Sequence, residues 1–240
     1  MSAISNPAPS SENPAEFDAF AENYDEVLNR SLSVSGDDKY FFALCRINWL
    51  WNLLARRNFF PERVLDYGCG TGTAVPFFFD LLDANSVIGV DVSEASLEVA
   101  RRIHTDRKAT FLPCLGYAPS GQIDLAYCNG VFHHIPPPAR HACAEYVLQS
   151  LRPGGLFAYW ENNPWNPGAR YCMRVNPFDR DAIPLAPAES RQLLRSVGFE
   201  ILTTNYLFIF PKALSWFRWL EPPLCRLPCG AQYLVFCQRP

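Results

Sequence analysis

A glycine-rich turn that follows a short apolar strand constrains this chain more than any other feature. Residues 63–66 (Arg-Val-Leu-Asp) predict a buried strand, and the glycines at 68, 70 and 72 predict a bend into a helix from Ala74 to Leu82. Glycine tolerates the positive φ angles and the close backbone approach that such a bend needs. The unpaired N–H groups at the start of the next helix favour an anionic group above the turn. The turn is therefore predicted to bind a ligand.

Strands and helices alternate after this turn. The pattern predicts strands at 86–91, 109–112, 123–128 and 155–161, with helices at 93–104 and 139–151 between them. The last third predicts a helix from Pro187 to Val197, followed by strands at 200–210 and 232–238. A further helix is expected from about Lys39 to Arg57. Such alternation is typical of βαβ units, which form a mostly parallel sheet.

Two acidic residues narrow the class of ligand. Asp66 immediately precedes the glycine turn, where a carboxylate can accept a hydrogen bond from an ammonium group. Asp91 ends the second strand, where an acid can bind both hydroxyls of a ribose. An acid at this position suits dinucleotide-binding enzymes and methyltransferases alike. The glycines follow the spacing GxGxG, whereas the dinucleotide fingerprint is GxGxxG. The anionic group above the turn is then a pyrophosphate in a dinucleotide enzyme, or the methionine carboxylate of S-adenosylmethionine in a methyltransferase.

Residues 64–72 and 89–93 resemble the first two motifs of the class I S-adenosylmethionine-dependent methyltransferases that act on small molecules. The similarity continues through residues 123–135 and 151–156, so that it covers about 63 to 160. It implies an α/β, Rossmann-like, doubly wound fold. That fold has a mostly parallel seven-stranded sheet, an antiparallel C-terminal strand and helices on both faces. It also implies methyl transfer from S-adenosylmethionine to an O, N or C nucleophile of a small molecule. The aromatic residues of the C-terminal third suggest that this molecule could be partly apolar or lipid-linked.

The same resemblance implies roles for individual residues in cofactor binding. Asp66, Gly68 and Gly70, with Cys69 between them, would hold the methionine part, and Asp91 the ribose. Val92 would flank the adenine, and Asn129 would border the methionine end through its backbone. Many relatives bind the adenine amino group with an acid after the third strand, but this chain has Leu115 and its neighbours there, which implies apolar contacts. The sequence from Phe17 to Asp25, with Tyr24, resembles the N-terminal helix that closes over the cofactor.

Candidates for catalysis and acceptor binding follow the fourth and fifth strands. His133 and His134 are each predicted either as a general base or as a structural histidine. Glu161 could contact the acceptor, or it could pair with Arg170 or Arg174. Asn163 and Trp165 lie in a polar loop that could be an acceptor pocket, a lid or a surface connection. No metal site is expected, because no third ligand accompanies the two histidines.

The organisation of the chain is predicted from changes in composition. Residues 1–15 are expected to be a flexible tail, and residues 16–240 one methyltransferase domain with a helical cap at 16–60. Residues 161–187 and 211–230 are expected to form the acceptor or lid segments. The aromatic stretch 212–227 is predicted either as a helix packed on the core or on a partner subunit, or as an apolar lid or an interfacial helix on a membrane.

The composition excludes some classes of protein. A formal net charge of −3 disfavours nucleic acid as a partner. Nine cysteines without a CxxC pair predict reduced thiols in a cytoplasmic protein, and no apolar run is long enough for a transmembrane helix. The partner is therefore expected to be a small-molecule methyl acceptor, while the oligomeric state stays open. Two alternatives also stay open: a catalytically silent nucleoside-binding scaffold or sensor and, disfavoured by the glycine spacing, a nicotinamide-dependent oxidoreductase.

Overall fold

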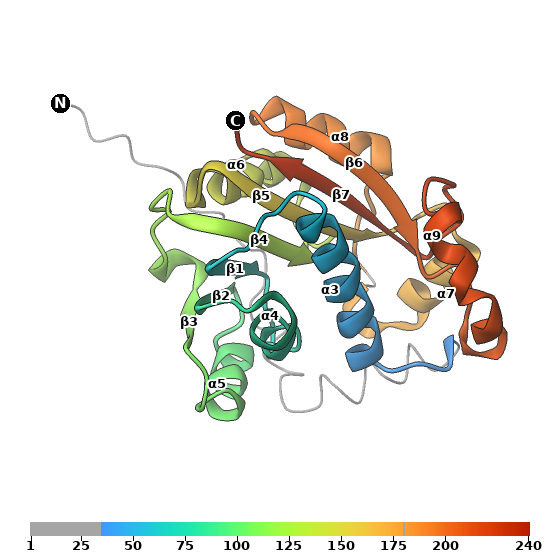
Figure 1. The fold of residues 1–240 in the computed structure, drawn as a ribbon, viewed down its shortest axis with the longest axis horizontal. Helices are drawn as coiled ribbons and strands as arrows, with labels where there is room; N and C mark the ends of the chain where they lie inside the picture. Colours follow the sequence, from blue (N-terminus) through green and yellow to red (C-terminus); the bar gives the residue numbers. More distant parts are fainter. Residues whose placement is uncertain (1–34, 180) are drawn as a thin grey trace.

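The sheet of the protein has seven strands in the order β3-β2-β1-β4-β5-β7-β6, in a computed structural model that describes residues 35–179 and 181–240 (Figure 1). Only β7 runs antiparallel to its neighbours, which are β5 and β6. The expected Rossmann-like α/β fold is thereby confirmed. The strands are β1 (Arg63–Tyr67), β2 (Ser86–Asp91), β3 (Ala109–Pro113), β4 (Ile123–Asn129), β5 (Leu151–Asn162), β6 (Glu200–Leu207) and β7 (Gln232–Gln238).

The parallel register brings the carboxyl ends of five strands to one edge of the sheet. Asp66 in β1 lies beside both Gly89 in β2 and Tyr127 in β4. Asp91 pairs with Pro113, and Asn129 pairs with Trp160. Open α/β sheets bind their ligands outside these carboxyl ends, so the register determines where a ligand site belongs.

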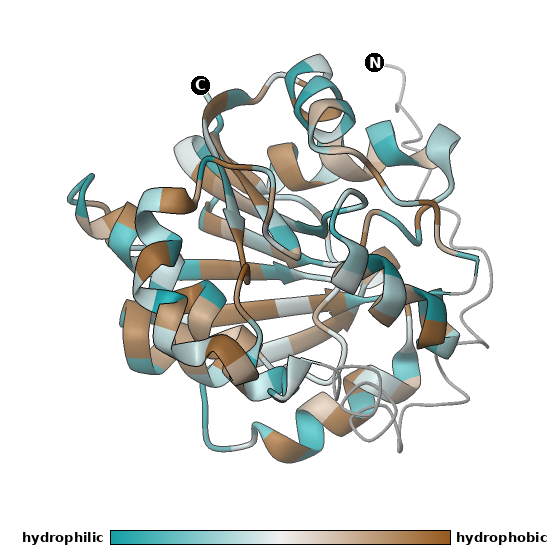
Figure 2. Cartoon of the chain, turned by 90° about the vertical axis from the view of Figure 1, so that its right-hand side faces the viewer, coloured by the Kyte–Doolittle hydropathy of each residue, from teal (hydrophilic) through white to brown (hydrophobic). Residues whose placement is uncertain are grey.

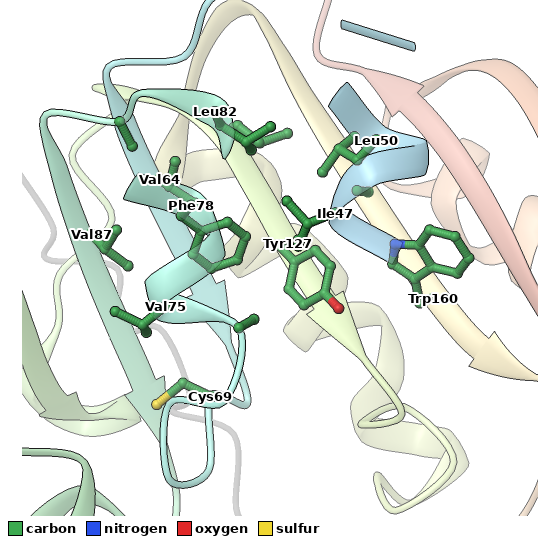
Figure 3. Packing of buried hydrophobic residues seen from close by; sticks show 14 of the residues in the cluster. Ile47, Leu50, Val64, Cys69, Val75, Phe78, Leu82, Val87, Tyr127 and Trp160 are labelled. Carbon is green, nitrogen blue, oxygen red and sulfur yellow. The ribbon is translucent and has the colours of Figure 1, made fainter. Parts of the chain in front are cut away.

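Helices cover both faces of the sheet and bury the alternate side chains of the strands. One face packs against α3 (Lys39–Ala55), α4 (Val75–Leu82) and α5 (Glu94–Ile103). Figure 3 shows the centre of this cluster, where Phe78 of α4 and Ile47 of α3 lie beside Tyr127. The other face packs against α6 (Arg140–Ser150) and α8 (Pro187–Ser196). The core therefore rigidly supports the strands whose ends form the ligand edge.

The helix boundaries follow from capping chemistry. Asp38 and Ser93 accept the backbone N–H groups of Phe41 and Ser96, which fixes the first turns of α3 and α5. Gly198 follows α8 with a φ of +110°, and glycine is the residue that most often adopts such a positive φ at the C-terminal end of a helix. None of the helices in the described ranges is both long and apolar enough to cross a membrane.

Strand β6 ends at Leu207, three residues earlier than expected. Phe208 has a φ of +64°, which turns the chain out of the sheet. The carboxylate of Glu221 then accepts the backbone N–H groups of Phe208, Ile209 and Phe210, so these groups no longer need a neighbouring strand. Hydrogen bonds to Glu221 therefore replace strand pairing at residues 208–210. The sequence around β6 alone does not reveal this replacement.

Two segments predicted as irregular or aromatic contain short helices. The loop after β5 forms α7 (Pro167–Val175) and the 3-10 turn η4 (Pro177–Asp179). The aromatic stretch forms the 3-10 segment η5 (Lys212–Leu220) and α9 (Glu221–Leu224). The side of the molecule that carries α7 and α9, turned toward the viewer in Figure 2, mixes hydrophobic and hydrophilic segments. The predicted tail, the N-terminal helix with Tyr24 and residues 16–34 of the expected helical cap lie outside the described residues.

Candidate active site

The glycine loop between β1 and α4 is folded tightly against the end of β2. The backbone N–H groups of Gly68 and Cys69 both donate to the carbonyl oxygen of Val90, at 2.8 and 3.1 Å. Gly68 has a φ of +74°, and a Cβ atom there would lie 2.2 Å from Cγ2 of Val131. Gly70 has a φ of +52°, yet a Cβ atom there would meet no described atom within 4 Å. The loop is thus packed beneath Gly68 and open above Gly70, where a ligand has room.

Asp91 connects this loop to the next helix. Its Oδ2 atom accepts the backbone N–H of Gly70 at 2.8 Å, and its Oδ1 atom accepts that of Ser93 at 2.9 Å. Each carboxylate oxygen thus holds one backbone N–H group. The side chain therefore shapes the loop and lies beside the open space above Gly70.

Asp66 is a buried carboxyl group without a hydrogen-bond donor among the described residues. Burial raises its pKa most, the negative charge of Asp91 raises it further, and Arg46 opposes both, with the result that the pKa is about 8. A buried acid of this kind favours a positively charged ligand, which would stabilise the carboxylate. The ammonium group of an amino-acid moiety fits this position.

The other residues expected around the cofactor surround the same strand ends. Cys69 is buried within the loop, whereas Val92 and Leu115 are exposed large apolar side chains. The pairing of Asp91 with Pro113 places Leu115 just beyond the end of β3, on the 3-10 turn η2 (Cys114–Gly116). Asn129 ends β4, next to β1 in the sheet. Tyr24 lies outside the described residues.

A cavity of about 460 Å³ lies beside the loop. It is bounded by α3, the carboxyl ends of β4 and β5, α7 and the turn after β6. Lys39 lines this cavity, and its ammonium group donates to Oγ1 of Thr73 in the glycine loop at 3.3 Å. Asn129 lines it as well. The cavity is of the size typical of small-molecule sites and adjoins the loop expected to hold the cofactor.

His133 and His134 lie at one wall of this cavity together with Asp179. The Nδ1 atom of His133 lies 2.6 Å from Oε2 of Glu161, and its Nε2 atom lies 3.2 Å from Oδ1 of Asp179. The Nε2 atom of His134 lies 3.3 Å from the same Asp179 oxygen. Two histidines and two carboxylates therefore form one connected cluster.

The electrostatics of the cluster favour a positive charge between the carboxylates. Burial disfavours the charged form of His133, but Glu161 and Asp179 outweigh burial and raise the pKa of this imidazole to about 10. Burial likewise opposes ionisation of Asp179, yet the hydrogen bonds to the two histidines hold the pKa of this carboxyl well below its usual range. Asp179 stays ionised as a result, and the cluster attracts a cation or a proton.

Asp179 is the functional candidate that sequence reasoning missed. It lies 46 positions after His133, inside the 161–187 segment expected to form part of the acceptor site, but no spacing motif connects the two residues. Asn176 orients it, since the Asn176 side-chain amide donates to Oδ2 of Asp179 at 2.9 Å. An Asn-x-x-Asp pair is too common to have signalled this arrangement.

The chain is similar to known methyltransferases in sequence. Residues 64–155 match a family model described as a methyltransferase domain. The trans-aconitate 2-methyltransferase of Rhodopseudomonas palustris is 26% identical over 67% of this chain and 68% of that protein. The ubiquinone biosynthesis O-methyltransferase of Bordetella pertussis is 30% identical over 58% of this chain and 62% of that protein.

The chain is a class I S-adenosylmethionine-dependent methyltransferase. Its cofactor is S-adenosylmethionine. The carboxy-S-adenosyl-L-methionine synthase of Campylobacter fetus is 28% identical over 80% of this chain and 89% of that protein. An S-adenosylmethionine-dependent methyltransferase structure from Thermotoga maritima shares the fold, with a TM-score of 0.64, 20% identity, and coverage of 92% of this chain and 98% of that one.

Three residues of the methyltransferase that were expected to contact the acceptor do not line the cavity. Glu161 is buried and accepts hydrogen bonds from His133 and from the backbone N–H of Phe132. The alternative prediction, an ion pair with Arg170 or Arg174, is therefore wrong. Asn163 is fully buried and donates to the carbonyl oxygens of Pro228 and Gly230. The Trp165 side chain is 56% exposed. Their neighbours Asn162 and Asn166 line the cavity instead, because α7 folds back over the strand ends.

The aromatic segment of the methyltransferase is not a helix packed on the core. Trp216 and Trp219 are 73% and 72% exposed, and no residue of η5 is buried. Arg218 pairs with Asp37 and lines the cavity together with Pro211. The segment therefore reaches the cavity through a few side chains, while its tryptophans point away from the interior of the described chain.

Proposed function

We propose that this methyltransferase transfers the methyl group to an oxygen atom of a small molecule that has a polar reacting end and an apolar body. The observation that carries the proposal is the position of the cavity, which adjoins the glycine loop and has the His133–His134–Asp179 cluster in its wall. An oxygen nucleophile gains more from such a cluster than an amine does, because a hydroxyl must lose its proton to react well.

The lining of the cavity supports this acceptor class. Amide side chains and apolar side chains both line the cavity, together with charged side chains of α3 and η5. The amides are Asn129, Asn162, Asn166, Asn176 and Gln232, and the apolar residues include Phe42, Met173, Phe178, Phe208 and Phe210. A molecule that presents both polar and apolar groups fits this lining.

The bound cofactor supplies a methyl group that its sulfonium charge already activates. The residues proposed to hold it are Asp66 for the ammonium, Asp91 for the ribose hydroxyls, and Gly68, Cys69 and Gly70 for the carboxylate end. Val92 and Leu115 would contact the adenine, and Asn129 would border the methionine end. Orientation of two reactants can contribute up to roughly 7–11 kcal/mol to the barrier reduction, so positioning is the main task of these residues.

His134 is the histidine that we propose contacts the acceptor. Its side chain is 21% exposed toward the cavity, whereas that of His133 is 3% exposed and held by a carboxylate at each ring nitrogen. We further propose one domain over residues 16–240, in which 161–187 and 211–230 shape the acceptor site. Asn162, Asn166 and Arg218, which line the cavity, support this assignment.

The experiment is a ligand screen followed by a product assay. Thermal-shift measurements with S-adenosylhomocysteine and with NAD should show stabilisation by the first only. Mass spectrometry of reactions with phenols, carboxylic acids and amines should then show a mass gain of one methyl group on an oxygen acceptor. The same reactions are analysed for carboxy-S-adenosyl-L-methionine. Its formation would favour the activity named for the Campylobacter fetus relative over methyl transfer to an acceptor. Methylation of amines alone would contradict the proposed oxygen nucleophile.

A further inference from the structure

The wall of the cavity presents three side chains whose potential ligand atoms lie close together. One ring nitrogen of His133, one of His134 and an oxygen of Asp179 all lie within 4.8 Å of one another. Two of the separations are 3.2 and 3.3 Å. Ligand atoms around a metal ion at Zn–N distances of about 2.0–2.1 Å lie roughly 3.3 Å apart in a tetrahedron, so these separations suit a bound ion.

A proton and a metal ion are alternative occupants of this cluster. With protons only, a charged His133 donates to Glu161 and to Asp179, while a neutral His134 donates from Nε2 to the same oxygen of Asp179, with the two ring centroids 4.1 Å apart. One cation between the three donor atoms would satisfy both nitrogens and the carboxylate while both rings stay neutral.

The surrounding residues are arranged as in known metal sites. A metal-bound histidine typically donates its other ring N–H to a carboxylate or a carbonyl group, which fixes the ring orientation. His133 has this partner, since its Nδ1 atom lies 2.6 Å from the buried carboxylate of Glu161. Asn176 holds the other oxygen of Asp179, which leaves Oδ1 directed at the histidines. Each of these two ligands is thus oriented by a neighbour.

We propose that His133, His134 and Asp179 bind one divalent first-row transition-metal ion. Two imidazole nitrogens and one carboxylate suit Zn²⁺, Fe²⁺ or Co²⁺ better than Mg²⁺ or Ca²⁺, which prefer oxygen ligands. All three residues line the cavity, so the remaining coordination positions of the ion face the space for the acceptor. Binding of the ion does not depend on the proposed function. The further step, in which the ion coordinates the oxygen atom of the acceptor, rests on the proposed function.

The test uses the full-length protein after treatment with a chelator. Titration with Co²⁺, followed by calorimetry and by the visible absorption of the ion, should show one ion bound per chain with nitrogen and oxygen ligands and no thiolate charge-transfer band. The variants H134A and D179N should each bind Co²⁺ at least about tenfold more weakly, and E161Q should weaken binding by about 10–100-fold. H141A, which removes an exposed histidine of α6, is the matched control and should bind as the wild type does.

Circular dichroism and S-adenosylhomocysteine affinity show whether each variant is folded. Wild-type protein that binds no Co²⁺, or Co²⁺ binding that is unchanged in the folded H134A/D179N double variant, would overturn the proposal. If Co²⁺ binds as expected but no acceptor is methylated, the proposed function fails and the metal site remains. If an oxygen acceptor is methylated but Co²⁺ does not bind, the metal site alone fails.

Discussion

The carboxylate of Asp91 accepts the backbone N–H of Gly70 at 2.8 Å, which joins the end of β2 to the middle of the glycine loop. The same carboxylate accepts the N–H of Ser93, the N-cap residue of α5. One side chain therefore fixes the open part of the loop and the start of the next helix. A ligand above Gly70 would meet a carboxylate that is already oriented, so little entropy would be lost when it binds.

Replacing Asp91 with Ala should weaken the binding of S-adenosylhomocysteine by one to two orders of magnitude. Hydrogen bonds to charged groups contribute about 1.5–3 kcal/mol each, and the variant also loses the bond to Gly70. Calorimetry measures the change in affinity. D106A, which removes an exposed acid after α5, is the control and should bind normally. An affinity within twofold of wild type in D91A would rule out ribose binding by this residue.

Alanine at Gly68 and at Gly70 should differ in their effects on stability and on binding. A Cβ atom at position 68 would lie 2.2 Å from Val131, whereas one at position 70 would meet no described atom within 4 Å. G68A should therefore lower the free energy of unfolding by at least about 1–3 kcal/mol, as overpacking does. G70A should cost only the roughly 1–2 kcal/mol of its left-handed backbone.

G70A should nevertheless bind S-adenosylhomocysteine much more weakly, because its methyl group would occupy the open space above the loop. Chemical denaturation gives the stabilities, and calorimetry gives the affinities. The double variant G68A/V131A should recover part of the stability lost in G68A. The space above Gly70 is not the ligand site if G70A binds the ligand as tightly as wild type does.

The affinity for S-adenosylhomocysteine should rise from about pH 6 to near pH 8. The folded, ligand-free protein has Asp66 with a pKa of about 8, so this carboxyl is mostly protonated at neutral pH. An ammonium group stabilises the carboxylate, and binding below pH 8 therefore releases a proton. Well above this range the amino group of the ligand loses its own proton, and the affinity should fall again.

Calorimetry in buffers of different ionisation enthalpy measures the number of protons released. In D66N the release and the rise with pH should both disappear. D106N should behave as the wild type does. If wild-type affinity is constant between about pH 6 and pH 7.5, Asp66 is not the group that meets the ammonium.

The strand ends were predictable because local patterns determine them. An apolar strand, a glycine turn and an acid at the end of the next strand are encoded within about 30 residues, and parallel pairing then brings Asp66 and Asp91 to one edge. The N-cap of α5 at Ser93 was predictable for the same reason. Each of these features depends on neighbours in the sequence.

The acceptor side was not predictable in this way, because it depends on contacts between distant segments. Glu161 was expected in the cavity, but the neighbouring β4–α6 loop supplies His133 and draws the carboxylate inward. Asp179 reaches the histidines only because α7 and η4 fold back over the strand ends. No hydrophobic period or residue spacing in the sequence indicates that α7 and η4 fold back, so the sequence did not identify Asp179 as a site residue.

Asn163 should prove to be a structural residue of the acceptor side. Its Nδ2 atom donates to Pro228 and Gly230, and its Oδ1 atom accepts the N–H of Trp165, all within a fully buried site. N163A leaves these backbone groups unpaired, which should lower the free energy of unfolding by about 1–3 kcal/mol or more. W165A, at an exposed side chain beside it, should change that energy by no more than about 0.5 kcal/mol.

Thermal denaturation and steady-state kinetics separate this structural role from a role in acceptor binding. Below its melting temperature N163A should keep the wild-type KM for the acceptor, because the side chain does not line the cavity. N162A provides the comparison, since Asn162 does line the cavity and its removal should raise that KM. A raised KM in N163A with unchanged stability would instead mean that the loop opens and that Asn163 contacts the acceptor directly.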